Sequence, residues 1–229
     1  MFWKEPRFKN REDAGRQLAA RLLHLKNEHT AVLALPRGGV PVAYEIATAL
    51  HAPLDIVVAR KLGAPGEPEL AIGAVADGER SEQVLNDDVI RDLAVSEEYI
   101  RAEVARQLEE IERRETRYRR GRPRTPVEAR TAIVVDDGIA TGASARAALR
   151  ALRHARPQRL VLATPVAPPE TVSALRPEVD DLICLVTPNH FIAVGSYYDD
   201  FSQLTDDEVI ALLERARRHA LSQGDDHTP

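Results

Sequence analysis

Residues 133–146 constrain the fold more than any other part of the sequence. An apolar run of β-branched residues ends in two adjacent carboxylates, and a short loop with two glycines and two hydroxyl groups leads directly into an alanine-rich helical pattern. A buried parallel strand needs continuous apolar character, so the acids mark its carboxyl end, where ligands bind in open α/β sheets. The segment therefore predicts a strand, a ligand-binding loop and a helix within an α/β fold.

This loop combines two kinds of ligand-binding group. Gly138 and Gly142 let the backbone approach a ligand closely, and the amides of residues 141–144 at a helix N-terminus favour an anion. Asp136 and Asp137 repel phosphate unless a cation intervenes, but they accept hydrogen bonds from sugar hydroxyls. A magnesium-bound ribose phosphate satisfies both halves of the loop. No GxxxxGK[ST] sequence is present, which excludes a phosphate-loop NTPase.

Residues 134–144 resemble the ribose-phosphate signature of the type I phosphoribosyltransferases, in which an apolar run precedes Asp-Asp, three residues and Thr-Gly-x-Ser. The resemblance implies their fold, a mostly parallel central sheet flanked by helices. It also implies that Asp136 and Asp137 hold the ribose hydroxyls of phosphoribosyl pyrophosphate. A simple helix N-cap is the alternative, but it needs one Ser, Thr or Asp and not this whole set. The implied binding loop consists of Gly138, Ile139, Ala140, Thr141, Gly142, Ala143 and Ser144.

A second strand, loop and helix unit begins with the apolar run 31–35 and continues into Pro36, Arg37, Gly38 and Gly39. The planar cation of Arg37 suits phosphate oxygens, and paired glycines admit a ligand, although an ordinary tight turn would look the same. The loop resembles the pyrophosphate-binding loop of the family, especially that of xanthine-guanine enzymes. This implies that Arg37, Gly38 and Gly39 bind pyrophosphate, with Arg37 among the catalytic residues. The family's loop often holds a non-proline cis peptide, so we expect one beside Arg37.

A third strand is expected at residues 54–59, ending in Arg60 and Lys61. The next segment, 62–69, is so rich in Gly and Pro that we expect it to be irregular. Residues 70–85 have the alternating pattern of a hairpin. A mobile lid fits this pattern.

By resemblance, residues 61–86 form a flexible lid that closes over the pyrophosphate and excludes water. The same resemblance implies that Arg60 and Lys61 contact the pyrophosphate, with Lys61 among the catalytic residues. A basic strand end that faces solvent is the alternative for each of the two side chains.

Residues 187–203 concentrate aromatic and acidic side chains, although aromatics make up only 4% of the chain. They resemble the C-terminal hood of hypoxanthine-guanine phosphoribosyltransferases, which binds the nucleobase and faces the metal. Alignment on Gly195 puts Asp199 at the metal-facing position and Ile192, not an aromatic residue, at the stacking position. The implied Mg²⁺ residues are Asp199, Asp136 and Asp137, and the implied base-binding residues are Phe191, Ile192 and Tyr197. Core or dimer packing is the alternative for Tyr197, Tyr198 and Phe201.

The identity of the acceptor base stays open. Enzymes that act on 6-oxopurines have an acid where this chain has Ala140, and adenine enzymes do not. They also use a lysine near the fourth core strand, whereas residues 160–171 contain none. Neither guanine nor hypoxanthine is therefore supported.

Residues 87–120 have a strongly helical pattern, with Ser96 as the expected N-cap of a long helix. The end of this helix and the residues after it are rich in arginine between Arg113 and Arg124. A nucleic-acid surface is one interpretation, but the interleaved glutamates and the net charge of −5 favour a solvated face. Nucleic acid is therefore not an expected partner.

The remaining features predict one domain over residues 1–229, with a core at 11–186, a hood at 187–203 and a disordered tail at 224–229. Arg7, Phe8 and Arg11 are expected in a solvated N-terminal arm, with a place at the rim of the hood as the alternative. The first residues lack an apolar signal core, and no run of about 18 apolar residues occurs, so we expect a cytoplasmic protein without a membrane span.

These observations predict a Mg²⁺-dependent phosphoribosyltransferase that transfers the 5-phosphoribosyl group of phosphoribosyl pyrophosphate to a nitrogenous base and releases pyrophosphate. A homodimer is expected from the resemblance. A regulator that senses phosphoribosyl pyrophosphate or a nucleotide without catalysis is the alternative on the same fold.

Overall fold

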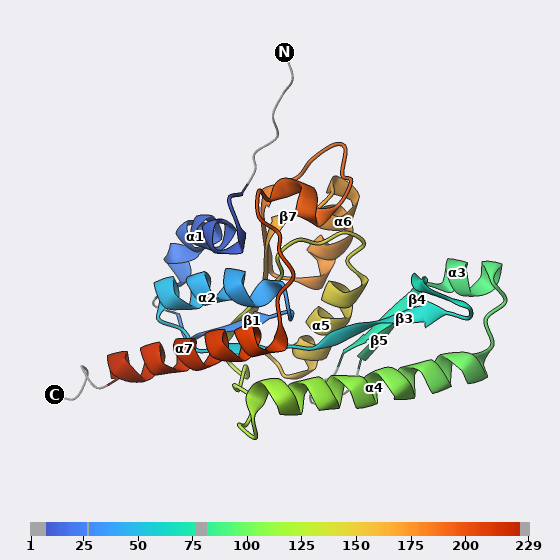
Figure 1. Ribbon diagram of the computed structural model, residues 1–229, viewed down its shortest axis with the longest axis horizontal. Helices are drawn as coiled ribbons and strands as arrows, with labels where there is room; N and C mark the ends of the chain where they lie inside the picture. Colours follow the sequence, from blue (N-terminus) through green and yellow to red (C-terminus); the bar gives the residue numbers. More distant parts are fainter. Residues whose placement is uncertain (1–7, 27, 77–81, 225–229) are drawn as a thin grey trace, which may run out of the picture.

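A five-stranded sheet forms the centre of the computed structural model, which describes residues 8–26, 28–76 and 82–224 (Figure 1). All neighbouring strands are parallel, in the order β2-β1-β6-β7-β8, which confirms the expected α/β fold. Local sequence explains the sheet, because the three central strands are predominantly apolar and buried, except for Arg159 at the start of β7, as parallel strands require. The strands are β1 (Thr30–Ala34), β2 (Leu54–Ile56), β6 (Thr131–Val135), β7 (Arg159–Val166) and β8 (Asp181–Val186).

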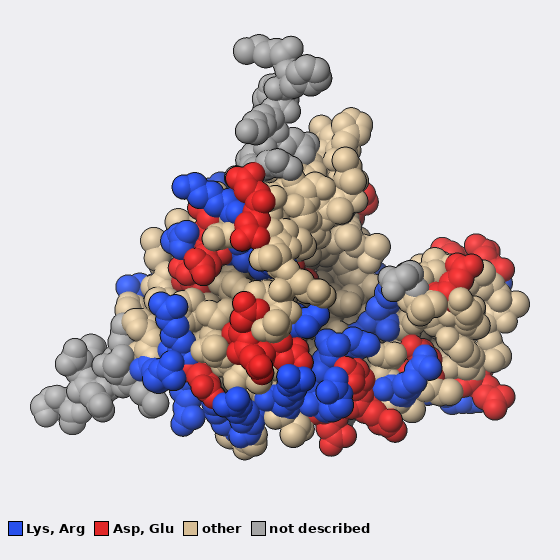
Figure 2. Space-filling view, in the orientation of Figure 1, with Lys and Arg blue, Asp and Glu red and all other residues tan. Residues whose placement is uncertain are grey.

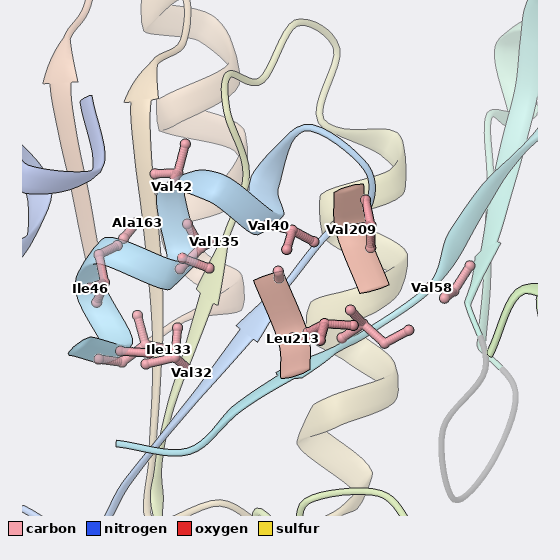
Figure 3. Close-up of a cluster of buried hydrophobic side chains, with 14 of the residues drawn as sticks. Val32, Val40, Val42, Ile46, Val58, Ile133, Val135, Ala163, Val209 and Leu213 are labelled. Atoms are coloured by element: carbon pink, nitrogen blue, oxygen red, sulfur yellow. The ribbon is translucent and has the colours of Figure 1, made fainter. Parts of the chain in front are cut away.

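The sheet lies between two layers of helices because alternate side chains of its strands point to opposite faces. Val32, Ile133 and Val135 pack on one face against α2 (Gly39–Leu50) and α7 (Asp206–Gly224), as Figure 3 shows. Helix α1 (Arg11–Leu22) adds Leu18 and Leu22 to the same cluster. Leu33 and Val134 face α5 (Ala143–His154) and α6 (Pro169–Leu175) on the other side.

A separate antiparallel sheet follows β2 and consists of β3 (Ala59–Ala64), β4 (Glu67–Ala76) and β5 (Glu82–Leu85). Two expectations were wrong here. The strand expected at 54–59 stops at Ile56, and the segment 62–69 is regular apart from its turn. Residues 62–69 pair regularly because a β-bulge at Gly63 absorbs the change of register. Glycine is needed at the bulge, since a Cβ there would lie 2.8 Å from Cα of Pro68.

The expected hairpin is confirmed as the β4 and β5 pair, although its tip, residues 77–81, lies outside the described residues. Both faces of the small sheet are covered. Leu62 and Ile72 pack with Ile111 of α4 (Glu97–Arg119), while Ala74 belongs to the cluster formed with α5. The described strands of the hairpin are packed on both faces. The flexibility expected for the lid stays a prediction.

Capping residues precede the two helices of residues 87–120, and Ser96 is the N-cap that the sequence predicts. Asn86 precedes α3 (Asp87–Asp92), and the Ser96 hydroxyl accepts a hydrogen bond from the Tyr99 amide at the start of α4. Short 3₁₀ segments occupy Leu23–Leu25, Arg176–Glu178 and Val194–Tyr197. Helix α7 continues to Gly224, and the rest of the expected disordered tail lies outside the described residues. None of the described helices is both long and apolar enough to cross a membrane.

The arginine-rich end of α4 is paired with carboxylates within the chain. Figure 2 shows Lys and Arg interspersed with Asp and Glu along the edge that α4 and α7 form. The Arg119 side chain, which is only 10% exposed, donates to Asp55 at 3.0 Å and to the Ile56 carbonyl at 2.7 Å, which ties α4 to β2. The other pairs are Arg113 and Arg114 with Glu110, Arg117 with Asp206, Arg124 with Glu115, and Arg120 and Arg122 with Glu214.

We expect Arg119→Met to lower the free energy of unfolding by about 3–5 kcal/mol, because it leaves the buried carboxylates of Asp55 and Glu115 without their shared cation. Denaturant unfolding measures this loss. The matched control is Arg101→Met on the same helix, whose exposed pair with Glu97 is worth about 0.3–0.5 kcal/mol. Equal effects of the two substitutions would contradict a structural role for the buried network.

Candidate functional site

The loops after β1 and β6 lie against each other at the carboxyl edge of the central sheet. The register pairs Ala34 with Val135, so both strands end at the same level. A Cβ on Gly38 would lie only 2.1 Å from Oδ2 of Asp137, and one on Gly39 would lie 2.5 Å from the Val135 carbonyl oxygen. The two loops therefore form one site. A side chain at position 39 would collide with the backbone of the β6 loop, and one at position 38 would displace the Asp137 carboxylate.

The Pro36-Arg37 peptide is cis, which confirms the expectation for this loop. The Arg37 guanidinium lies 3.8 Å from the carboxylate of Asp206, at the start of α7. Asp206 also accepts a hydrogen bond from the Tyr118 hydroxyl at 2.7 Å and pairs with Arg117 at 2.7 Å. Asp206 thus connects the Arg37 loop to the place where α4 contacts α7.

A cleft of about 450 Å³ opens above the two loops. Six of the sequence-predicted residues line it: Arg37, Gly38, Asp136, Asp137, Gly138 and Ser144. The other lining residues are Arg11, Leu35, Pro36, Ala59, Phe201, Gln203 and Leu204. The cleft therefore combines a carboxylate pair, a cationic loop and an aromatic wall.

Residues 139–143 of the predicted binding loop do not line the cleft, and hydrogen bonds to neighbouring elements hold them in place. The amide of buried Ile139 donates to the Val166 carbonyl at 2.9 Å, and the Thr171 hydroxyl donates to the Ala140 carbonyl at 2.5 Å. Gly142 has a φ of 79°, a left-handed conformation that favours glycine, immediately before α5 begins. These contacts fix Ser144 in the first turn of α5, where the helix dipole favours an anion.

The two carboxylates lie side by side at a position where burial disfavours a second negative charge. The Asp137 amide donates to Oδ1 of Asp136 at 2.9 Å, and Nε of Arg11 donates to Oδ2 of Asp137 at 2.7 Å. Burial raises the pKa of Asp136 well above its usual value, and the charge of Asp137 raises it further. The pair is therefore suited to bind hydroxyl donors or an additional cation.

Arg11 was not predicted as a site residue, and its expected place in a solvated arm was wrong. Its side chain is only 11% exposed, its guanidinium lies 3.9 Å from the Phe201 ring centroid, and its Nη1 donates to the Ser202 carbonyl at 2.9 Å. Phe8 is also buried, whereas Arg7 lies outside the described residues. One sequence signal existed, since an arginine in the first turn of a helix opposes the helix dipole.

The hood is built from both ends of the chain. Phe8 forms a parallel bridge with Tyr198, and the Tyr198 hydroxyl donates to the backbone carbonyl of Asp137 at 2.5 Å. The predicted base-binding residues do not line the cleft. Tyr197 is buried and stacks on Phe191, and both belong to the packing of the hood itself, while Ile192 is 85% exposed. Phe201, which sequence reasoning did not select, is the aromatic residue of the cleft.

Arg60 and Lys61 line a neighbouring pocket and not the cleft that contains the carboxylates. The difference follows from the course of the chain, because both residues belong to β3, which leads away from the cleft, and Arg60 bonds to Gln107 of α4. Pro36 and Ala59 line both spaces and therefore lie at the boundary between them. The predicted contact of Arg60 and Lys61 with pyrophosphate stays untested.

The two carboxylates of the cleft fit a magnesium ion whose other oxygen ligands come from the substrate and from water. Among the described residues, no three His, Cys, Asp or Glu side chains form a group that could hold a metal ion. Asp199 is exposed, and its amide donates to the Phe8 carbonyl at 2.8 Å, so the structure does not group it with Asp136 and Asp137. One or two carboxylates completed by substrate phosphates and water are a usual Mg²⁺ site.

We expect Arg11→Met to raise the pKa of Asp136 further, because the Arg11 charge lowers it in the native protein. A carboxyl NMR titration in metal-free buffer measures the shift. Asp136 keeps its proton in the folded state, whereas in the unfolded state it releases this proton near pH 4. The free energy of unfolding should therefore fall as the pH rises from about 4 through the raised pKa of Asp136. Arg16→Met, at an exposed position of the same helix, is the control. An unchanged titration would contradict the coupling.

Comparisons with known proteins agree with this geometry. Residues 7–201 match the phosphoribosyl transferase domain family. The chain is 49% identical to a provisionally named phosphoribosyl transferase of Mycobacterium tuberculosis over 217 residues, which are 95% of this chain. The match covers 48% of the mycobacterial protein, so the chain spans about half the length of that relative. The crystal structure of TT1426 from Thermus thermophilus superimposes with a TM-score of 0.77 at 44% identity, covering 91% of this chain and 98% of that one. The chain belongs to the phosphoribosyl transferase domain family.

Proposed function

We propose that the chain binds phosphoribosyl pyrophosphate with Mg²⁺ in the cleft, transfers its 5-phosphoribosyl group to a nitrogenous base and releases pyrophosphate. The observation that carries this proposal is the contact of Gly38 with the Asp137 carboxylate. It joins an arginine-glycine loop and an acidic loop in one cleft of about 450 Å³, which is large enough for a sugar phosphate beside a small acceptor.

Each part of the cleft has a role in this proposal. Asp136 and Asp137 accept hydrogen bonds from the ribose hydroxyls, and Ser144 with the N-terminus of α5 binds the 5′-phosphate. Arg37 lies on the opposite loop and offers a planar cation to the pyrophosphate. These residues lower the barrier by holding the anomeric carbon in line with the acceptor and by stabilising the charge on the departing group.

Asp136 and Asp137 are also the residues that would hold magnesium. When bound, the metal would neutralise charge that develops on the pyrophosphate oxygens. Burial and the charge of Asp137 raise the pKa of Asp136, so a cation beside the pair would stabilise its ionised form. Arg11 already acts in this direction through its bond to Asp137. Asp199, which is exposed outside the cleft, would take part only through water or a movement of the hood.

The acceptor would lie against the wall formed by Phe201, Gln203 and Leu204. An aromatic ring, an amide and an apolar side chain together suit a flat heterocycle with polar edges. Arg11 stacks on Phe201 and binds Asp137, so it holds the ribose end and the acceptor end of the cleft in a fixed relation. This wall replaces the predicted set of Phe191, Ile192 and Tyr197 in the proposal.

A sensor that acts through the basic surface between Arg113 and Arg124 has less support. The arginines of this surface pair with carboxylates of α4 and α7, so little positive charge is left for a nucleic acid. Sensing of phosphoribosyl pyrophosphate without catalysis would need another output surface.

Turnover is tested with phosphoribosyl pyrophosphate, Mg²⁺ and a panel of bases, with pyrophosphate release as the readout. We expect Asp137→Asn to keep the fold and to lower release by at least about 100-fold, because an amide cannot replace the charge that faces the sugar and the metal. Asp200→Asn, at an exposed carboxylate of the hood, is the control. If the native chain binds the substrate but no base releases pyrophosphate, the sensor is favoured; if it does not bind, the proposal fails.

Two phenylalanines of the hood allow a matched test of the acceptor wall. We expect Phe201→Leu to raise KM for the acceptor about tenfold, because it removes the ring that faces the cleft. Phe191→Leu should leave this KM unchanged and affect only stability, since Phe191 packs on Tyr197. The reverse order of effects would restore the base-binding residues that the sequence predicts.

A further inference from the structure

The first turn of α7 connects the acceptor side of the cleft with the arginine-glycine loop. Gln203 and Leu204 line the cleft, and the carboxylate of Asp206, two residues further along the chain, lies 3.8 Å from the Arg37 guanidinium. Arg37 lines the cleft itself, whereas Asp206 does not. The carboxylate therefore approaches this cation from outside the cleft.

Local contacts fix the start of α7. The Thr205 hydroxyl accepts a hydrogen bond from the Glu208 amide at 3.2 Å, and the Glu208 carboxylate accepts one from the Thr205 amide at 2.7 Å. This reciprocal pair is a capping box, which satisfies backbone donors at a helix N-terminus. Buried Val209 and Leu213 anchor the next turns on the core. Asp206 is therefore held between a closed cap and a buried anchor.

Two side chains of α4 orient the Asp206 carboxylate. Figure 1 shows α7 beside the C-terminal end of α4. The Tyr118 hydroxyl donates to Oδ1 of Asp206 at 2.7 Å, and Nη1 of Arg117 lies 2.7 Å from Oδ2. Burial raises the pKa of Tyr118 to about 12, and Asp206 contributes to the rise, so the hydroxyl keeps its proton and acts as the donor. Oδ1, the oxygen nearest Arg37, is therefore fixed by a buried partner.

The direction of the Arg37 side chain depends on this carboxylate. Within the part of the chain that the structure describes, no other carboxylate lies at ion-pair distance from Arg37, and the side chain is 37% exposed. A long side chain with this exposure has several rotamers, and ordering it only when a ligand binds costs conformational entropy. A charge beside the guanidinium favours the rotamer at the cleft in advance and lowers that cost.

We propose that Asp206 is a positioning residue, which holds the Arg37 guanidinium at the cleft where it receives the diphosphate of phosphoribosyl pyrophosphate. The inference rests on the proposed function for the identity of this ligand. Asp206 does not touch the ligand, so it acts through Arg37. Its own negative charge opposes anion binding at longer range, and Arg117 offsets that effect from 2.7 Å.

Calorimetric titration of the full chain with phosphoribosyl pyrophosphate and Mg²⁺ tests the proposal. We expect Asp206→Asn to bind about fivefold more weakly than Asp207→Asn, because the amide oxygen still accepts hydrogen bonds but carries no charge beside Arg37. Asp207→Asn is the matched control, since it removes the same charge from the same turn at a side chain that is 88% exposed.

A double-mutant cycle with Arg37→Gln separates positioning from a structural role. The difference between Asp206→Asn and Asp207→Asn should disappear once Arg37 is replaced, whereas a structural role of Asp206 would preserve it. Tyr118→Phe is the second variant if Asp206→Asn does not fold. It keeps the carboxylate but removes the hydroxyl that orients it, so it should also weaken binding only while Arg37 is present.

Nitrogen NMR of the arginine side chains tests the contact without a ligand. The Nε–H signal of Arg37, identified by its loss in Arg37→Gln, should shift in Asp206→Asn and stay in place in Asp207→Asn. An unchanged signal in Asp206→Asn, equal binding by the two variants, or a difference that survives Arg37→Gln would overturn the proposal. If the native chain does not bind phosphoribosyl pyrophosphate but the Arg37 signal depends on Asp206, the proposed function fails and the positioning of Arg37 stands.

Discussion

The architecture of the site depends on the contact between Gly38 and the carboxylate of Asp137. The register of β1 with β6 brings the two loops to the same level, and the missing side chain at position 38 lets them touch. The contact puts Arg37 and the carboxylate pair on the same cleft. Burying adjacent carboxylates is costly, and Arg11 offsets part of this cost through its bond to Asp137.

Local patterns were sufficient to predict the parts of the fold that short segments determine. The apolar runs before Pro36 and Asp136 are strands, the following loops lie at the carboxyl edge, and Ser96 caps a long helix. The same patterns placed the two loops in one cleft, because both belong to strand, loop and helix units of a parallel sheet. Six of the predicted residues line the cleft for this reason.

Features that depend on tertiary contacts could not be predicted. Gly63 and Pro68 indicate irregular structure locally, but a bulge lets their strands pair. Arg11 contacts Asp137 across 126 positions, a distance over which no local pattern carries information. Phe191 stacks on Tyr197, whereas Phe201 contacts Tyr198 and Arg11 and lines the cleft, and these contacts come from tertiary packing.

The bridge between Phe8 and Tyr198 has a consequence for biosynthesis. A ribosome makes the N-terminal part first, so Arg11 and Phe8 emerge long before the segment that covers them. Asp137 can bind Arg11 earlier, but Phe201 and Leu204 of the cleft emerge only after β8, the last strand of the central sheet. The nascent chain would therefore complete the central sheet before it completes the wall of the cleft.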